Sequence, residues 1–133
     1  TMTDTITLRG LVATTPRHIV TSDGLPITSF RLASTTRRFD RTENRWIDGE
    51  TNWYTITTFR QLAVNAAQSI SKGQRIILTG VVRIREWESD ERTGTNVEVE
   101  SESIGHDLAW GTAVFSRSVS TPSEQEPAEA VSA

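Results

Sequence analysis

The sequence predicts a small all-β domain in which five strands close into a Greek-key barrel, with one helix between the third and fourth strands. Runs of alternating or β-branched residues recur through most of the chain, and polar turns separate them. Only one stretch repeats its apolar residues at spacings of three and four, as a helix does. A chain of 133 residues has room for one such domain and little more.

Three strands are predicted before the helix. Residues 4–13 alternate threonine with apolar side chains, and Ser22-Asp23-Gly24 then marks a turn. Residues 25–38 have strand character again, and the polar residues 39–51 are expected to form a loop or hairpin tip. Residues 52–59 (NWYTITTF) are rich in aromatic and β-branched side chains, which favours the third strand.

The helix is predicted over residues 60–71, and Lys72-Gly73 supplies a basic last turn and a glycine stop. Its apolar face consists of Leu62, Ala63, Ala66, Ala67 and Ile70. After the helix the pattern predicts, in order, a strand over residues 75–87, a polar loop over 88–95, a strand over 96–104 and a short extra strand at 113–115.

This order of elements is the plan of the OB-fold, a Greek-key barrel of five strands with a helix between the third and the fourth. We expect the barrel and its extra C-terminal strand to occupy residues 1–116. Residues 117–133 are mostly Ser, Pro, Glu and Ala, with almost nothing to bury. They are predicted to be a disordered tail.

The net charge of −3 is unusual for a protein that binds nucleic acid. Three Glu and one Arg follow Ser116, so the tail carries most of this charge and the body is close to neutral. The sequence has no cysteine, which excludes disulfides and thiolate metal sites. It shows no secretory signal and no apolar run of transmembrane length, so we expect a cytoplasmic location and no membrane partner.

Residues for catalysis are sparse. His18 and His106 lie far apart in the sequence, and neither belongs to a cluster with metal-ligand spacing. Glu98, Glu100 and Glu102 alternate along a predicted strand and are interpreted as its solvated side. No phosphate-cradling loop, nucleophile elbow or zinc-protease motif is present. The sequence therefore predicts a protein that is not an enzyme and holds no cofactor or metal.

The aromatic residues are more informative, because residues two apart in a strand share a face. Trp53 and Phe59 share one face with two threonines, while Ile56 lies on the other. Later in the chain Trp87 shares a face with two arginines. This combination suits a nucleic-acid single strand, whose bases stack on the rings while guanidinium groups contact phosphate. The alternative is that these rings belong to the core.

The predicted loop over residues 39–51 and its approach also interleave aromatic and basic residues. Such a segment is too polar for the core and fits a flexible finger along a nucleic-acid backbone, although a merely solvated loop is the alternative. The candidate nucleic-acid contacts in the whole chain are Phe39, Trp46, Trp53, Phe59, Trp87, Arg37, Arg38, Arg41, Arg45, Lys72, Arg83 and Arg85.

Several segments together resemble the bacterial single-stranded DNA-binding proteins. They are ITLRG at residues 6–10, FRLAS at 30–34, WY at 53–54, FRQLA at 59–63, KG at 72–73 and LTG at 78–80. The resemblance covers roughly residues 4–115, and the segments WIDGE and VEVE point to the actinobacterial branch. It implies sequence-independent binding of single-stranded DNA in replication, recombination, repair or chromosome segregation. It also implies a homotetramer of OB domains, with an extra C-terminal strand hooking a neighbouring subunit.

The resemblance carries individual residues with it. The family's base-stacking aromatics match Trp53, Phe59 and Trp87, and Phe39 stands where many relatives have Trp. Lys72 and Arg85 match basic residues that line the DNA path. A family histidine tied to subunit contacts is replaced by Tyr54, so tetramer strength is expected to differ.

The C-terminal sequence departs from the family pattern. Typical members end in an acidic tip closed by Pro and Phe, which docks repair and replication enzymes, and this sequence ends EPAEAVSA. It resembles the short paralogues that lack the tip, so we do not expect the usual tip-docking partners. A location at the nucleoid follows from the DNA ligand.

Two alternatives to single-strand binding stay open on the sequence. One is an enzyme on an OB scaffold, such as a nuclease, which needs a carboxylate and arginine cluster around a metal. The other is an OB-fold assembly subunit with weak or no DNA binding. Quenching of tryptophan fluorescence by oligo(dT) distinguishes the assembly subunit, because only stacking brings bases against Trp53 and Trp87.

Overall fold

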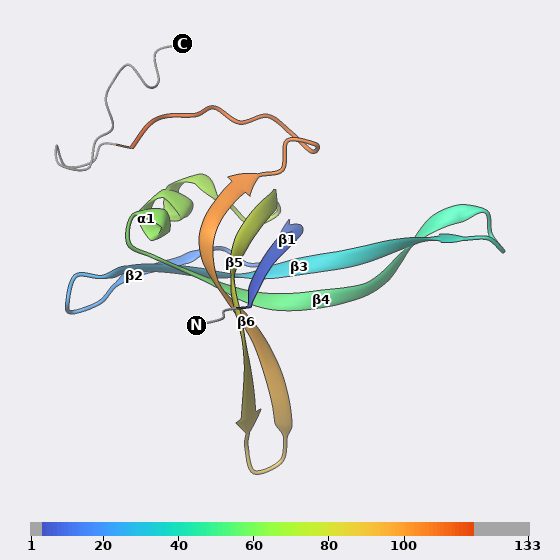
Figure 1. The fold of residues 1–133 in the computed structure, drawn as a ribbon, viewed down its shortest axis with the longest axis horizontal. Coiled ribbons are helices and arrows are strands. Elements are labelled where there is room, and N and C mark those ends of the chain that lie inside the picture. Colours follow the sequence, from blue (N-terminus) through green and yellow to red (C-terminus); the bar gives the residue numbers. More distant parts are fainter. Residues whose placement is uncertain (1–3, 119–133) are drawn as a thin grey trace.

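A computed structural model describes residues 4–118 (Figure 1). Within these residues, six strands and one helix follow one another. They are β1 (Thr5–Val12), β2 (Arg17–Val20), β3 (Pro26–Asp40), β4 (Arg45–Phe59), α1 (Arg60–Ser69), β5 (Arg75–Glu88) and β6 (Thr93–His106). The five predicted barrel strands and the helix are found, with different bounds. The helix follows the fourth strand and not the third, because β2 was not predicted.

The strands form one sheet in the order β1-β5-β6-β4-β3-β2, and an additional pairing of β1 with β3 closes it into a barrel. All pairs are antiparallel except β4 with β6, which run parallel. β2 has only four residues, all of them exposed, so it lacks the apolar alternation by which a strand is predicted. It forms a hairpin with β3 across the predicted turn, where Gly24 has a φ of +85°.

The core fills the barrel, and α1 covers one end of it (Figure 1). Leu32, Ile56 and Ile76 are fully buried in it. Of the predicted apolar face, the helix buries Ala63 and Ala66, while Leu62 and Ala67 are half-buried. The remaining buried apolar residues are Leu8, Val12, Phe30, Ile70, Leu78 and Val99.

The helix ends earlier than predicted. Ser69 is its last residue, and Ile70 leaves it in an extended conformation, so its side chain continues into the core. Lys72 and Gly73 therefore lie in the following turn, where Gly73 has a φ of +94° and donates a backbone hydrogen bond to Val12. The sequence predicted Lys72 in a basic last turn of the helix. In the structure, Lys72 lies in the turn that follows the helix.

Two hairpin arms project from the barrel (Figure 1). The first consists of the outer parts of β3 and β4, so most of the predicted loop over residues 39–51 is strand. The second consists of the outer parts of β5 and β6, and it takes in part of the predicted loop over residues 88–95. Both faces of each arm are exposed to water, so neither face needs to be apolar. The sequence of the arms therefore lacks the hydrophobic alternation that marks a half-buried strand.

The predicted extra strand at residues 113–115 is not formed. Within the described residues, 111–118 run without strand pairing. A strand needs the backbone groups of a neighbouring edge, and none is paired with this segment in the single chain. From residue 119 on, the predicted disordered tail lies outside the described residues.

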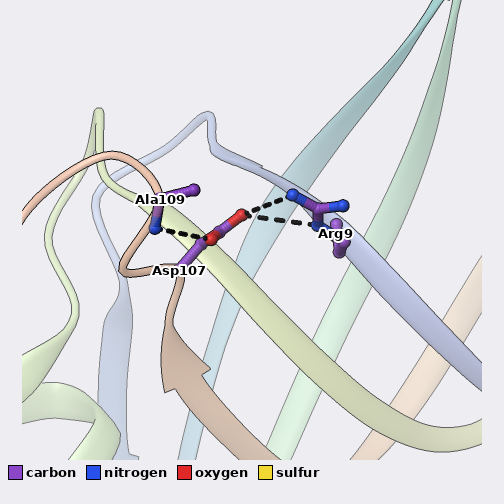
Figure 2. Close-up of polar contacts among 3 residues, drawn as sticks. All are labelled: Arg9, Asp107 and Ala109. Carbon is purple, nitrogen blue, oxygen red and sulfur yellow. Dashed lines mark hydrogen bonds and ion pairs between the residues drawn. The ribbon is translucent and has the colours of Figure 1, made fainter.

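The chain after β6 is held at its start (Figure 2). Asp107 accepts hydrogen bonds from the Ala109 backbone N–H at 3.0 Å and from Arg9 Nη2 at 3.1 Å. These two contacts, the first above all, lower the pKa of Asp107. Three residues further on, the Trp110 ring lies 4.2 Å from the Arg75 guanidinium. The segment is thus anchored to β1 and β5 before it runs past α1.

Candidate nucleic-acid interface

The outer face of β4, β6 and β5 carries five of the twelve predicted binding residues: Trp53, Phe59, Arg83, Arg85 and Trp87. Thr55 of β4 pairs with Glu98 of β6, which in turn pairs with Arg83 of β5. The adjacent pair, Ile56 and Val99, is fully buried. Successive residues of a strand point to opposite faces. The side chains of Thr55, Glu98 and Arg83 therefore lie together on the outside of the barrel.

Trp53 lies on this face two residues before Thr55, and 51% of its surface is exposed. The guanidinium of Arg31 lies 5.8 Å from its ring centroid, and Arg31 Nη1 donates a hydrogen bond to Thr55 Oγ1 at 2.9 Å. The ring is therefore outside the core, as predicted, and a neighbouring cation orients it. Arg31 was not among the predicted site residues. Its position between the core residues Phe30 and Leu32 is the signal that it faces outward.

Trp87 lies on the same side of the β5–β6 arm and is 42% exposed. It pairs directly with Gly94 of β6, and a Cβ atom built on Gly94 would overlap its ring. Because residue 94 is glycine, the Trp87 indole can lie across the partner strand. The opposite face of the indole is then presented to solvent.

A β-bulge brings the aromatic residues of the β3–β4 arm to the face of Trp53. Thr35 pairs with Thr51 and Arg37 with Asp48, so three steps on β4 match two on β3. The extra residue lies beside Gly49, where an added Cβ would come within 3.0 Å of the Thr36 carbonyl oxygen.

Without the bulge, Trp46 and Trp53 would lie on opposite faces, because they are seven positions apart along the strand and residues an odd number of positions apart face opposite ways. With the bulge, Trp46 and its register partner Phe39 lie on the same face as Trp53, farther out along the arm. Their ring centroids lie 5.6 Å apart, at an interplanar angle of 41°. The two rings form an aromatic pair near the tip of the arm.

Most of the predicted arginines face a carboxylate. Arg85 Nε lies 3.2 Å from Glu98 Oε1, and Arg83 Nη2 lies 3.8 Å from Glu100 Oε2. On the β3–β4 arm, ion pairs join Arg37 to Asp48 at 3.7 Å and Arg45 to Glu43 at 2.7 Å. Glu98 and Glu100 were interpreted as the solvated side of a strand, and that side is the candidate face itself.

The other predicted residues are more dispersed. Phe59 ends β4, half-buried, six residues beyond Trp53 on the same side. Arg38 and Arg45 lie on the side of the arm opposite Arg37, and Arg41 lies in the tip. Lys72 lies in the turn between α1 and β5. The structure thus gathers Trp53, Trp87, Arg83, Arg85, Phe39, Trp46 and Arg37 on one side.

Among residues 4–118, no group of three or more His, Asp or Glu side chains is placed to hold a metal ion. His18 Nδ1 is hydrogen-bonded with the buried Thr28 hydroxyl at 2.7 Å, and His106 Nε2 with Gln74 Oε1 at 2.9 Å. Both histidines thus make hydrogen bonds to neighbouring elements. No helix in the described part of the chain is long and apolar enough to cross a membrane.

The sequence matches the single-strand binding protein family over residues 3–107. The chain belongs to this family. Single-stranded DNA-binding protein 2 of Tropheryma whipplei (strain Twist) is 54% identical over 112 residues, which is 84% of this chain and 74% of that protein. Single-stranded DNA-binding protein 1 of Streptomyces coelicolor is 40% identical over 118 residues, covering 89% of this chain and 75% of the relative.

Solved structures of family members have the same fold. The small single-stranded DNA-binding protein from Streptomyces coelicolor superposes with a TM-score of 0.75 at 38% identity, over 84% of this chain and 99% of that one. The second single-stranded DNA-binding protein of Mycobacterium smegmatis gives 0.67 at 22% identity, over 87% and 100%, and supports the fold alone. The predicted family and OB-fold class are confirmed. The family is one of DNA-binding proteins and not of enzymes, as expected from the sequence.

Proposed function

We propose that this member of the single-strand binding protein family holds single-stranded DNA on the outer face of β4, β6 and β5 and on the same side of the β3–β4 arm. The observation that carries the proposal is the position of Trp53 and Trp87. Both rings lie outside the core on one face, Trp53 on β4 and Trp87 on β5 with β6 between them, where they expose apolar surface to water. Burial would otherwise stabilise a barrel of this size, so their exposure favours a binding role.

In this proposal, bases stack on Trp53 and Trp87 while arginines of the same face contact the phosphates. Every base has a π-face, so stacking tolerates any sequence, and phosphates carry no base identity. The Phe39 and Trp46 pair extends the path along the β3–β4 arm. Coating of single strands without base readout follows, and it serves replication, recombination, repair or chromosome segregation. A nucleoid-associated, cytoplasmic location fits this ligand.

Titration with oligo(dT) tests the proposed function. We expect tryptophan fluorescence to be quenched as the strand binds, because bases lie against the indole rings. The logarithm of the binding constant should fall with the logarithm of salt concentration, with a slope of about −0.7 per phosphate contacted. Binding without quenching, or with no salt dependence, would contradict this path. The alternative of an assembly subunit that does not bind DNA is not favoured, since the relatives carry the name of DNA-binding proteins.

We propose further that the chain forms a homotetramer. β1 pairs along most of its length with β5 on one side, and on its other side only Leu11 and Val12 pair with β3. Beyond β6, Val114 is 98% exposed and Phe115 is 87% exposed in the single chain. An open strand edge and exposed apolar side chains both favour subunit contacts. Light scattering at micromolar concentration should give four times the mass of one chain, and a monomer would refute the proposal.

A further inference from the structure

The candidate face carries carboxylates that neutralise its arginines. They form a row of ion pairs between β5 and β6. Glu98 lies opposite Arg83 in the register and binds Arg85, while Glu100 lies opposite Val81 and binds Arg83. Each arginine is thus paired diagonally with a glutamate two positions along β6.

The two glutamates also lie between the proposed stacking residues. β6 separates β4, which carries Trp53, from β5, which carries Trp87. Glu98 pairs with Thr55 on one side and with Arg83 on the other, so its carboxylate is in the middle of the face. A strand that crosses from Trp53 to Trp87 must pass over this acidic row.

Ion pairs of a different geometry occur on the β3–β4 arm, where Asp48 lies directly opposite Arg37 and Glu43 lies in the tip two residues before Arg45. Arg37 faces Asp48 and Arg45 faces Glu43, so four of the six arginines predicted to contact DNA already have an anionic partner. In the described residues, Arg38 and Arg41 have no such ion pair. The near-neutral charge of the body therefore reflects local pairing on the binding surface and not only acidic residues elsewhere.

We propose that Glu98 and Glu100 compete with DNA phosphates for Arg85 and Arg83, and so set the affinity and the salt dependence of binding. The proposal rests on the proposed function. Glu98 contacts Arg85 at Nε, so a phosphate that binds Arg85 either displaces this carboxylate or shares the guanidinium with it, and in both cases the carboxylate stays close to the phosphate. Binding of a phosphate to a paired arginine therefore releases less free energy than binding to an unpaired one. The carboxylates also weaken the long-range electrostatic attraction of the face for a DNA strand.

Glu98→Gln and Glu100→Gln test this competition, with Glu102→Gln as the matched control. Glu102 is an exposed glutamate of the same strand, located at the bulge between Thr79 and Gly80, and no ion pair joins it to the arginines. All three substitutions remove one negative charge, so the control measures the general effect of net charge. We expect Glu98→Gln and Glu100→Gln each to bind oligo(dT) about two- to fivefold more tightly than the control, the scale of an exposed ion pair. The salt slope should steepen by up to about 0.7 for each freed arginine.

A second measurement separates competition from a purely structural role. In an Arg85→Ala background, Glu98→Gln should bind no more tightly than Glu102→Gln in the same background, because no guanidinium is left to release. Thermal melting of each variant verifies folding. The same comparison can be made independently with Glu100→Gln in an Arg83→Ala background.

The outcomes are distinct. If the parent protein fails to bind oligo(dT), the proposed function itself is wrong. If the parent binds and both glutamine variants match Glu102→Gln in affinity and slope, the competition is refuted and the proposed function stands. Weaker binding by the glutamine variants would also overturn the inference, because it would show that the carboxylates hold the arginines in place for DNA.

Discussion

Replacing Trp53 with alanine is expected to weaken oligo(dT) binding by about 1–3 kcal/mol, which is roughly 5- to 150-fold. The substitution removes one base-stacking surface and also leaves Arg31 without the ring over which it lies. Trp87→Ala should act on the same scale, because its indole offers a second stacking surface on β5. Fluorescence titration at fixed salt measures both losses, and the salt slope should change little because no phosphate contact is removed.

Trp110→Ala is the matched control for the loss of a tryptophan. Trp110 is also exposed, at 61%, but it lies over Arg75 at the opposite end of β5 from Trp87. We expect its replacement to leave the affinity unchanged. Thermal melting should show that Trp53→Ala and Trp87→Ala stay folded, since neither ring belongs to the core. Full affinity in both variants, or their unfolding, would contradict an exposed stacking face.

Gly80→Ala is expected to destabilise the fold by about 1–3 kcal/mol or more, the usual cost of inserting a methyl group into a packed site. Gly80 is buried in β5 where the register with β6 shifts. An added Cβ would lie 2.8 Å from the Cα of Ser101 and would overlap the backbone oxygen of Glu100. Relief requires the two strands to separate at the base of the arm. The melting temperature should fall by roughly 5–20 °C.

Gly105→Ala provides the comparison within the same sheet. Gly105 lies in β6 opposite Ile77, and no heavy atom lies within 4 Å of the position of an added Cβ. Its replacement should change the free energy of unfolding by no more than about 0.5–1 kcal/mol, in either direction. Equal melting temperatures for the two variants would show that the close packing at Gly80 is not required.

The barrel and its single helix were predictable because buried faces leave a period in the sequence. Ile56 and Thr58 alternate with Thr55 and Thr57, and the same period placed Trp53 on the outside. β2 left no such signal, since all four of its residues are exposed. The arms were assigned to loops for the same reason, because pairing between two solvated strands produces no hydrophobic alternation.

The composition of the site was less predictable than its location. Alternation shows that Glu98 and Arg85 both face outward, but only the register shows that they are neighbours. The bulge beside Gly49 has no clear sequence signature, and it decides whether Trp46 lies with Trp53 or opposite it. The predicted strand at residues 113–115 depends on pairing with a strand edge, and this segment pairs with none in the single chain.

Photo-crosslinking tests most directly whether the strand crosses the face between Trp53 and Trp87. An oligo(dT) that carries 5-iodouridine is irradiated in complex with the protein, and mass spectrometry of the peptides identifies the linked residues. We expect crosslinks at Trp53 and Trp87, together with Phe39 or Trp46 on the β3–β4 arm. Crosslinks at Trp110 or along α1, with none at Trp53 or Trp87, would place the DNA on a different surface and contradict the proposed path.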